Sequence, residues 1–244
     1  MGRVFLIILV FILLTMLSQI GGLVYLLAIC IPVKRISQFF IFLVLYAITS
    51  YGIVPMIARE TGRVQVRSTF ISTILNRNYV RPDLKAVIVD MENVNCLDAN
   101  FPFINGFPLF PHLSHNDGYK LDIAFRYIDK RTNKETDQIP SWNGYGIYEE
   151  PLPHEVNMPA ECERKGRWQY SLLHYITPQS SRENYKLDLA GTKALILKLV
   201  ANPSVKKIFL EPHLKSRMAI ESDKIRYQGC KAVRHDDHIH VEIQ

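Results

Sequence analysis

The C-terminal stretch Arg234-His-Asp-Asp-His-Ile-His-Val-Glu-Ile243 decides how the rest of this 244-residue chain is interpreted. From His238 onward polar and apolar residues alternate strictly, which is the period of a β-strand with one buried face. His238 and His240 therefore point the same way from a stiff support. Ile239 and Val241, which alternate with them, point the other way.

A second stretch, His112-Leu-Ser-His-Asn-Asp-Gly-Tyr-Lys-Leu-Asp122, has a related pattern. Alternation around its end places Asp122 on the polar face of another strand, with His115 in a turn-rich approach. Zinc favours imidazole nitrogen and carboxylate oxygen, and a catalytic zinc usually keeps three protein ligands and one open position for water. His115, Asp122 and His240 would supply these ligands, and His238 would then be free to act on the bound water.

The alternative is that the histidines are incidental, since a single His-x-His is common in proteins that bind no metal. The chain has 8 histidines, and five of them fall within the two stretches, at positions 112, 115, 235, 238 and 240. Clustering on strand-like segments beside an aspartate favours a metal site.

The His-x6-Asp motif that ends at Asp122 and the His-x-His motif that ends at His240 resemble the zinc-peptidase group that contains lysostaphin and the D-Ala-D-Ala metallopeptidases. Within that group the chain is most similar to the penicillin-insensitive murein endopeptidases. His112 and His235 each stand three residues before a site histidine, and residues 202–212 resemble the strand and turn that lead into the helix before the last strand. The resemblance covers roughly residues 80–244.

The resemblance implies hydrolysis of peptidoglycan peptides with a zinc ion, and it gives roles to residues. Zinc would be held by His115, Asp122 and His240, with His238 as general base and with His112 and His235 lining the site. Asp236 and Asp237 would orient histidines, because ligating imidazoles usually give their second ring hydrogen to a carboxylate or carbonyl.

Two features depart from the pattern of that group. Leu113 stands where a basic residue is expected, and residues 129–165 form a poorly matched insertion. A long irregular segment is often a binding loop or lid. Trp142, Tyr145 and Tyr148 in this insertion have two possible roles, stacking on sugar or peptide and ordinary surface packing.

Two long apolar runs occupy the N-terminal quarter, at residues 4–33 and 39–58. A bilayer-spanning helix needs ~20 apolar residues. The runs therefore predict two transmembrane helices, with a membrane anchor over residues 1–63 and a zinc peptidase domain over residues 64–244. A cleaved signal peptide explains the first run less well, because the apolar core of a signal peptide is much shorter than this run. A buried hairpin of a soluble protein is the other alternative.

The net charge of +6 does not indicate a nucleic-acid partner. Residues 1–63 carry five basic side chains against one acidic one, so most of the basic excess flanks the apolar runs, and no Lys/Arg-rich stripe remains elsewhere. Lys34 and Arg35 favour a cytoplasmic loop between the helices, while Arg3, Arg59 and Arg63 favour the opposite orientation. The resemblance therefore decides the expectation, a bacterial inner-membrane protein whose catalytic domain faces the periplasm or cell exterior.

Periodicity predicts the remaining elements. A short helix is expected near residues 73–76, a buried strand at 86–90, a helix from Asp188 to about 201, a strand at 205–210 and a short helix from Pro212 to 220. His213 lies near the start of that last helix, whereas His154 and His174 have no paired pattern around them. Cys96, Cys162 and Cys230 allow one disulfide, whose pairing the spacing does not fix.

These expectations combine into an α+β fold, a small and mainly antiparallel sheet with flanking helices that carries the zinc site and follows two transmembrane helices. The expected activity is that of a membrane-anchored zinc metallopeptidase that cleaves D-Ala-containing cross-links. Two alternatives stay open, a zinc D,D-carboxypeptidase and a non-hydrolytic zinc-containing module that binds cell-wall peptides. The sequence does not choose the bond that is cut or the oligomeric state.

Overall fold

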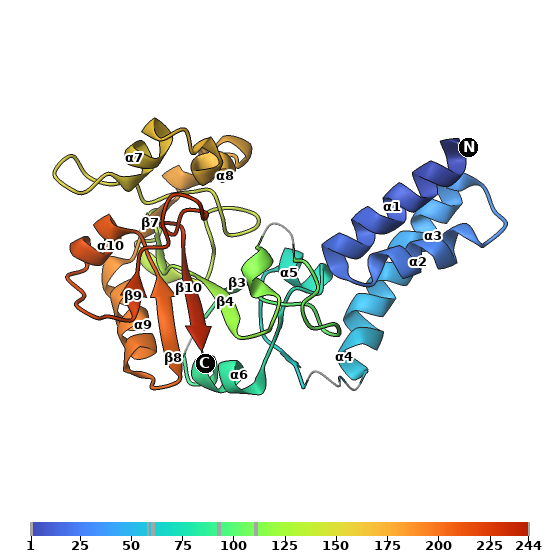
Figure 1. Cartoon of the computed structure of the whole chain (residues 1–244), viewed down its shortest axis with the longest axis horizontal. Helices are drawn as coiled ribbons and strands as arrows, with labels where there is room; N and C mark the ends of the chain where they lie inside the picture. Colours follow the sequence, from blue (N-terminus) through green and yellow to red (C-terminus); the bar gives the residue numbers. More distant parts are fainter. Residues whose placement is uncertain (1, 58, 60–61, 92–93, 110–111, 244) are drawn as a thin grey trace. The chain divides into compact units, whose positions relative to one another are not determined.

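The structure is a computed structural model that describes residues 2–57, 59, 62–91, 94–109 and 112–243 (Figure 1). It has the expected mixed α+β fold, with small sheets and flanking helices. The chain divides into two compact units. The first comprises Met1–Pro82 and Asp98–Gly118, and the second comprises Asp83–Leu97 and Tyr119–Gln244. The expected division after residue 63 stays a prediction.

The first unit begins with apolar helices, and here the expectation of two transmembrane helices is wrong. Only the helical stretch Arg35–Met56, of 22 residues, is long and apolar enough to cross a membrane among the described residues. The helical segments are α1 (Gly2–Ser18), α2 (Gly21–Ile29), α3 (Arg35–Ile48), a π-helical turn (Thr49–Ile53) and α4 (Val54–Met56). The last three form that one continuous stretch.

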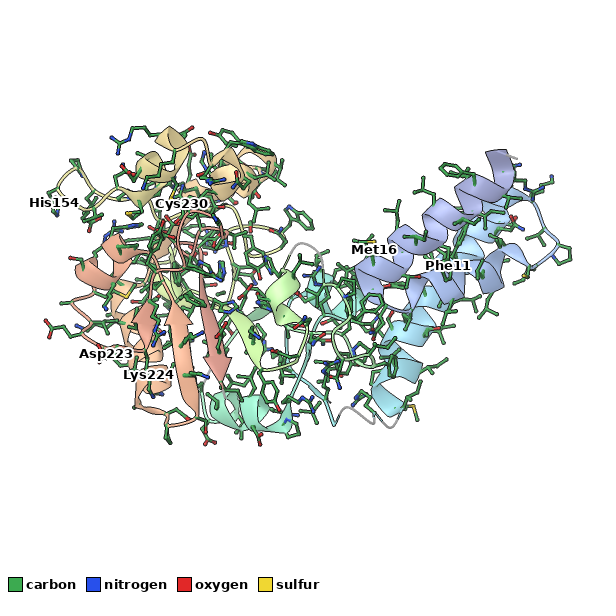
Figure 2. All side chains as sticks on the ribbon, in the orientation of Figure 1. Phe11, Met16, His154, Asp223, Lys224 and Cys230 are labelled. Carbon is green, nitrogen blue, oxygen red and sulfur yellow. A yellow bond between two sulfur atoms is a disulfide. The ribbon has the colours of Figure 1, made fainter. Side chains whose placement is uncertain are left out.

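The first apolar run does not form one helix of spanning length, because it is broken in the middle. Gln19 has a positive φ of 66°, so the helix stops at Ser18. At 1.5 Å per residue the 17 residues of α1 extend about 26 Å, less than the ~30 Å of a hydrocarbon core. The chain then packs back on α1, where a Cβ at Gly22 would lie 2.6 Å from the carbonyl oxygen of Phe11, which Figure 2 labels.

The rest of the first unit is held by a two-stranded antiparallel sheet and a buried arginine. Strands β1 (Val64–Gln65) and β2 (Tyr79–Val80) pair, and the expected short helix is α5 (Phe70–Ile74), which begins a few residues earlier than predicted. The Arg63 side chain is 1% exposed and donates to the carbonyl oxygen of Phe101 at 3.0 Å.

The five-stranded sheet carries Asp122 from one motif of the sequence, and His238 and His240 from the other. Its order is β3-β4-β10-β8-β9. Strand β10 is antiparallel to both of its neighbours, while β8 and β9 are parallel. The strand bounds are β3 (Cys96–Asp98), β4 (Lys120–Ala124), β8 (Val205–Phe209), β9 (Ile225–Arg226) and β10 (His238–Ile243). The mainly antiparallel sheet and the strands at both motifs are therefore as predicted.

Two predicted helices of the second unit are present, and one predicted strand is not. Helix α9 (Leu189–Ala201) begins at Asp188, whose side chain accepts from the backbone N–H of Gly191. At its other end Lys224, labelled in Figure 2, donates to the carbonyl oxygen of Val200 at 2.8 Å. Helix α10 (Pro212–Arg217) starts at a proline, where no amide hydrogen is needed.

The predicted strand at residues 86–90 is instead part of helix α6 (Pro82–Val89). Pro82 suits a first helical position and Asp83 favours the positive end of the helix dipole. Leu84, Val87 and Ile88 are buried at helical spacing. The prediction was wrong because this short apolar run was assigned the two-residue period of a strand instead of the period of a helix.

The insertion and the residues that follow it, up to Leu187, are ordered into short elements. Strands β5 (Tyr127–Asp129), β6 (Lys134–Thr136) and β7 (Tyr185–Leu187) form a second antiparallel sheet of order β6-β5-β7. Helices α7 (Met158–Arg164) and α8 (Leu172–Ile176) follow, with 3-10 turns at Trp168–Ser171 and Ser180–Glu183. A disulfide joins Cys162 of α7 to Cys230, which settles the pairing that spacing left open, and Cys96 is a buried free thiol.

Candidate metal centre

In the second unit the sheet register brings Asp122 and His240 together. The two residues are direct partners across the β4–β10 pair, so both side chains leave the same face of the sheet. His240 Nδ1 lies 2.8 Å from Asp122 Oδ1, and both side chains are buried. Two of the three predicted ligands thus meet because alternation placed them on matching faces of adjacent strands.

His238 lies two residues earlier on that face and is oriented by its neighbour. Its Nδ1 is 2.5 Å from Asp237 Oδ1, and its Nε2 is 3.8 Å from Asp122 Oδ1. Nε2 is buried and has no hydrogen-bond partner among the described residues. In the tautomer that donates from Nδ1 to Asp237, Nε2 carries the lone pair of the ring and lies toward the Asp122 carboxylate.

Tyr145 and Gly146, from the insertion, complete this part of the centre. The Tyr145 hydroxyl donates to Asp122 Oδ2 at 2.8 Å, and its ring packs edge-on against His238 with centroids 5.0 Å apart. The backbone N–H of Gly146 donates to Asp237 Oδ2 at 2.6 Å. The insertion therefore fixes both carboxylates that orient the histidines.

In the first unit the loop histidines are held by a buried ion pair. Arg77 donates from Nε and a terminal nitrogen to the two oxygens of Asp98, at 2.7 and 2.6 Å. His112 Nδ1 lies 2.7 Å from the same carboxylate. The rings of His112 and His115 are 5.4 Å apart, and His115 forms the end of a 3-10 turn, Leu113–His115.

A buried group in the first unit, made of Asp98, His112 and His115, could hold a metal ion. Each of these residues offers one ligand atom, and these atoms lie within 4.8 Å of one another. The group includes one of the predicted ligands, His115. Asp98 is a weaker candidate ligand than its position suggests, because the fork of Arg77 already engages both of its oxygens. We therefore interpret Asp98 as the residue that orients His112.

Burial and charge shift the pKa values of the buried groups in opposite directions. Burial opposes ionisation of Asp98, but the Arg77 guanidinium and the His112 hydrogen bond outweigh burial and lower the pKa of the carboxyl to about 2. Burial also disfavours the imidazolium form of His240. Its hydrogen bonds with Asp122 and Glu242 outweigh that effect and raise the pKa of the ring. In both groups the named partners therefore outweigh the effect of burial on the pKa.

The residues just before β10 form a buried support. The His235 ring is 4.9 Å from that of His238, and the His235 backbone N–H donates to Glu211 Oε1. Asp236 forms an ion pair with Arg234, which also stacks over the Tyr148 ring at 3.9 Å. Burial raises the pKa of Asp236 well above its usual range despite that guanidinium.

The predicted residues thus fall into two sets. Asp122, His238 and His240 lie together with Asp237 and beside His235, while His112 and His115 lie together on their own loop. Asp236 accepts from Arg234, and its Oδ2 atom lies 3.7 Å from His213 Nε2. The roles of these residues as ligands or base stay predictions.

Sequence interpretation missed several residues of the centre, namely Arg77, Asp98, Tyr145 and Glu211. Arg77 and Asp98 are separated by 21 positions and show no motif. Tyr145 was noted only as an aromatic residue of the insertion, and the neighbouring Asn143-Gly144 turn was the one local signal of an ordered approach.

Comparison with family models gives no match for this chain, and no curated protein matches it.

Proposed function

We propose that this protein is a zinc-dependent peptidase in which His115, Asp122 and His240 hold the metal and His238 is the general base. The observation that carries the proposal is the dyad of Asp237 and His238. This dyad turns a basic, buried Nε2 atom toward the carboxylate of Asp122. A protein that only bound a metal ion would have no use for an oriented base beside the ligands.

The donor set suits zinc. Imidazole nitrogens and carboxylates, without thiolates, are typical of catalytic zinc sites, and Cys96 is a buried thiol whose pKa is raised by burial to about 12. Carboxylate partners for ligating imidazoles are the usual outer support of such sites. A zinc ion held by these residues would supply Lewis acidity, which polarises a scissile carbonyl and acidifies a water molecule.

The protein's own groups would do the proton transfer. His238 Nε2 would take a proton from the attacking water. The Nδ1–H group would keep donating to the Asp237 carboxylate, which stabilises the imidazolium that forms. The same Nε2–H would then donate to the leaving amine. Tyr145 keeps the Asp122 carboxylate in one orientation and shields the His238 ring from solvent.

The substrate class of the proposal, peptidoglycan peptides with D-Ala-containing cross-links, rests on the resemblance of the motifs to murein endopeptidases. Two observations support an extracytoplasmic site of action. The disulfide between Cys162 and Cys230 fits an oxidising compartment. Arg63, one of the charges that opposed this orientation, is buried against backbone carbonyls and is therefore not an exposed charge at the membrane flank.

The test uses the full-length protein in detergent and purified, cross-linked muropeptides. Metal content is measured by mass spectrometry, and products are identified by liquid chromatography with mass spectrometry. We expect one bound zinc per chain, release of uncrosslinked monomers, loss of activity with a chelator and recovery with added zinc. Loss of only a terminal D-Ala would show that the protein is a carboxypeptidase and not an endopeptidase. Bound zinc without any product would support the non-hydrolytic binding module.

The orientation in the membrane is tested separately. A reporter that is active only in the cytoplasm is fused after residue 63, and a second reporter that is active only in the periplasm is fused at the same point. The proposal predicts activity from the periplasmic reporter alone. Activity from the cytoplasmic reporter would refute the orientation and, with it, the murein substrate.

A further inference from the structure

The second unit has a groove of about 490 Å³ that the proposed hydrolysis does not use. It runs between residues 138–142 and residues 178–185, and no Asp, Glu, Lys or Arg is among the described residues that line it. A neighbouring groove of about 320 Å³ on the same three-stranded sheet is lined by Arg126, Glu135, Asp137 and Asp188. The absence of charge is thus a property of the first groove and not of this whole surface.

The groove presents an exposed indole. Trp142 is 63% exposed, whereas Tyr145 and Tyr148 of the same segment are buried. Surface packing, one of the two roles considered for these aromatic residues, therefore accounts for the tyrosines and not for Trp142. What distinguishes Trp142 is that its exposed indole lines the groove, where a ligand could cover its apolar surface.

The backbone on either side of the indole is fixed. Ser141 Oγ donates to Asn143 Oδ1 at 3.2 Å, and that amide oxygen also accepts from the backbone N–H of Tyr145. The hydroxyl of Ser181 donates to the carbonyl oxygen of Pro140, which ties the two walls of the groove together. The indole is therefore held ready for contact without the entropy cost of ordering a mobile loop.

The lining has the chemistry of a saccharide site. A pyranose ring has a face of C–H groups that packs on an aromatic plane, while its hydroxyl and acetamido groups need neutral hydrogen-bond partners. Trp142 and the half-buried Tyr185 offer aromatic surface, and the exposed amides of Gln138 and Asn184 offer both donors and acceptors. The volume falls in the ordinary range of small-ligand sites.

We propose that this groove binds a neutral, N-acetylated sugar chain, and we identify it with the glycan strand that bears the peptides of the proposed substrate. This identification rests on the proposed function. Trp142 is only three residues from Tyr145, which donates to Asp122, and four from Gly146, which donates to Asp237. A glycan held on Trp142 would thus be held by the same fixed segment that orients the candidate centre.

Direct binding is measured first, because it does not depend on catalysis. The chain has two tryptophans, and Trp168 is 66% exposed outside the groove, so it is a matched control. The full-length Trp168→Phe variant in detergent reports the fluorescence of Trp142 alone, and the Trp142→Phe variant reports that of Trp168 alone. Titration with a tetramer of N-acetylglucosamine should give a saturable change in the first variant and none in the second. No saturable change in the first, or an equal change in both, would overturn the proposal.

Hydrolysis then tests whether the sugar contact serves the reaction. Two substrates are compared, intact cross-linked murein and the same cross-linked peptide dimer freed of sugar. Trp142→Ala should lower the rate on murein about tenfold, the size of one lost stacking contact, and leave the rate on the free peptide within about twofold. Trp168→Ala should change neither rate. Equal losses on both substrates would show that the groove binds peptide, which contradicts the proposal.

The outcomes separate this inference from the proposed function. Saturable sugar binding at Trp142 without hydrolysis of any substrate would refute the peptidase and keep the saccharide site. Metal-dependent hydrolysis with no effect of Trp142→Ala on murein and no sugar-induced fluorescence change would keep the peptidase and refute the saccharide site.

Discussion

Replacing Asp237 by asparagine tests whether His238 is the base, because the change moves the proton of the His238 ring from Nδ1 to Nε2. In the native protein one Asp237 oxygen accepts from Gly146 N–H and the other lies against His238 Nδ1. An asparagine has only one oxygen to offer. The backbone N–H of Gly146 can only donate, so the amide oxygen must face Gly146 and the amide NH₂ must face His238. This forces His238 into the tautomer that accepts at Nδ1 and carries its proton on Nε2, where it cannot act as a base.

The expected loss in turnover for Asp237→Asn is roughly 10²- to 10⁴-fold, the usual contribution of a general base. This corresponds to about 3–5 kcal/mol of activation free energy. The cost to folding should be smaller, about 1–3 kcal/mol for one altered charged hydrogen bond. Zinc content should be unchanged, because none of the proposed ligands is altered.

The assay compares initial rates on the cross-linked peptide dimer with zinc content and thermal melting of the same preparations. Asp223→Asn, the same chemical change on the exposed Asp223, is the matched control and should behave as wild type. If Asp237→Asn kept near-native turnover with zinc bound, His238 would not be the base. If the variant lost its zinc, Asp237 would be part of the metal site and not the partner of a base.

Four further outcomes are expected. His240→Ala should lose both zinc and activity, whereas His238→Ala should keep zinc and lose turnover roughly 10²- to 10⁴-fold. Metal analysis and initial rates measure these two effects. Equal zinc loss in both variants would contradict the assigned roles. Tyr145→Phe removes one hydrogen bond to Asp122 and should lower the zinc affinity about 10-fold with the fold intact, measured by competition with a chelator. Asp98 has a folded pKa of about 2 against an ordinary value of 3.8, so its stabilisation, about 2 kcal/mol, is present above pH 4 and is lost as pH falls through 2. The stability difference between wild type and Asp98→Asn should therefore shrink over that range in urea titrations, and a constant difference would show that Asp98 is not ionised in the fold. Cys162→Ser opens a link between residues separated by 68 positions and should lower the free energy of unfolding by about 2–4 kcal/mol, with no added effect of a reducing agent in the variant.

The sequence by itself determined the parts of this protein that depend on local period. Strict alternation around His240 and Asp122 predicted two strands with matching polar faces, and the observed register pairs these two residues directly. Helix α9 was predicted from apolar spacing, and α10 from its leading proline. In each case a few consecutive residues carry the whole signal.

Where two local signals conflicted, the prediction failed. The short apolar run at 86–90 fits a strand and a helix equally well. It forms a helix in the structure, where Leu84, Val87 and Ile88 are buried on one side. The first apolar run has the composition of a membrane span, but a left-handed Gln19 and the close approach at Gly22 break it into two shorter helices. Hydropathy averages over such a break because it counts side chains and not backbone angles.

Only the tertiary structure decided which residues support the candidate centre. Arg77 reaches Asp98 across 21 positions, and Tyr145 reaches Asp122 across 23, with no motif to mark either pair. Likewise, Trp142 could be separated from Tyr145 and Tyr148 only by its exposure. Ligand types and their spacing are set by the strand repeat and are visible in the sequence. Their hydrogen-bond partners are set by how distant segments pack, and a one-dimensional pattern does not record that packing.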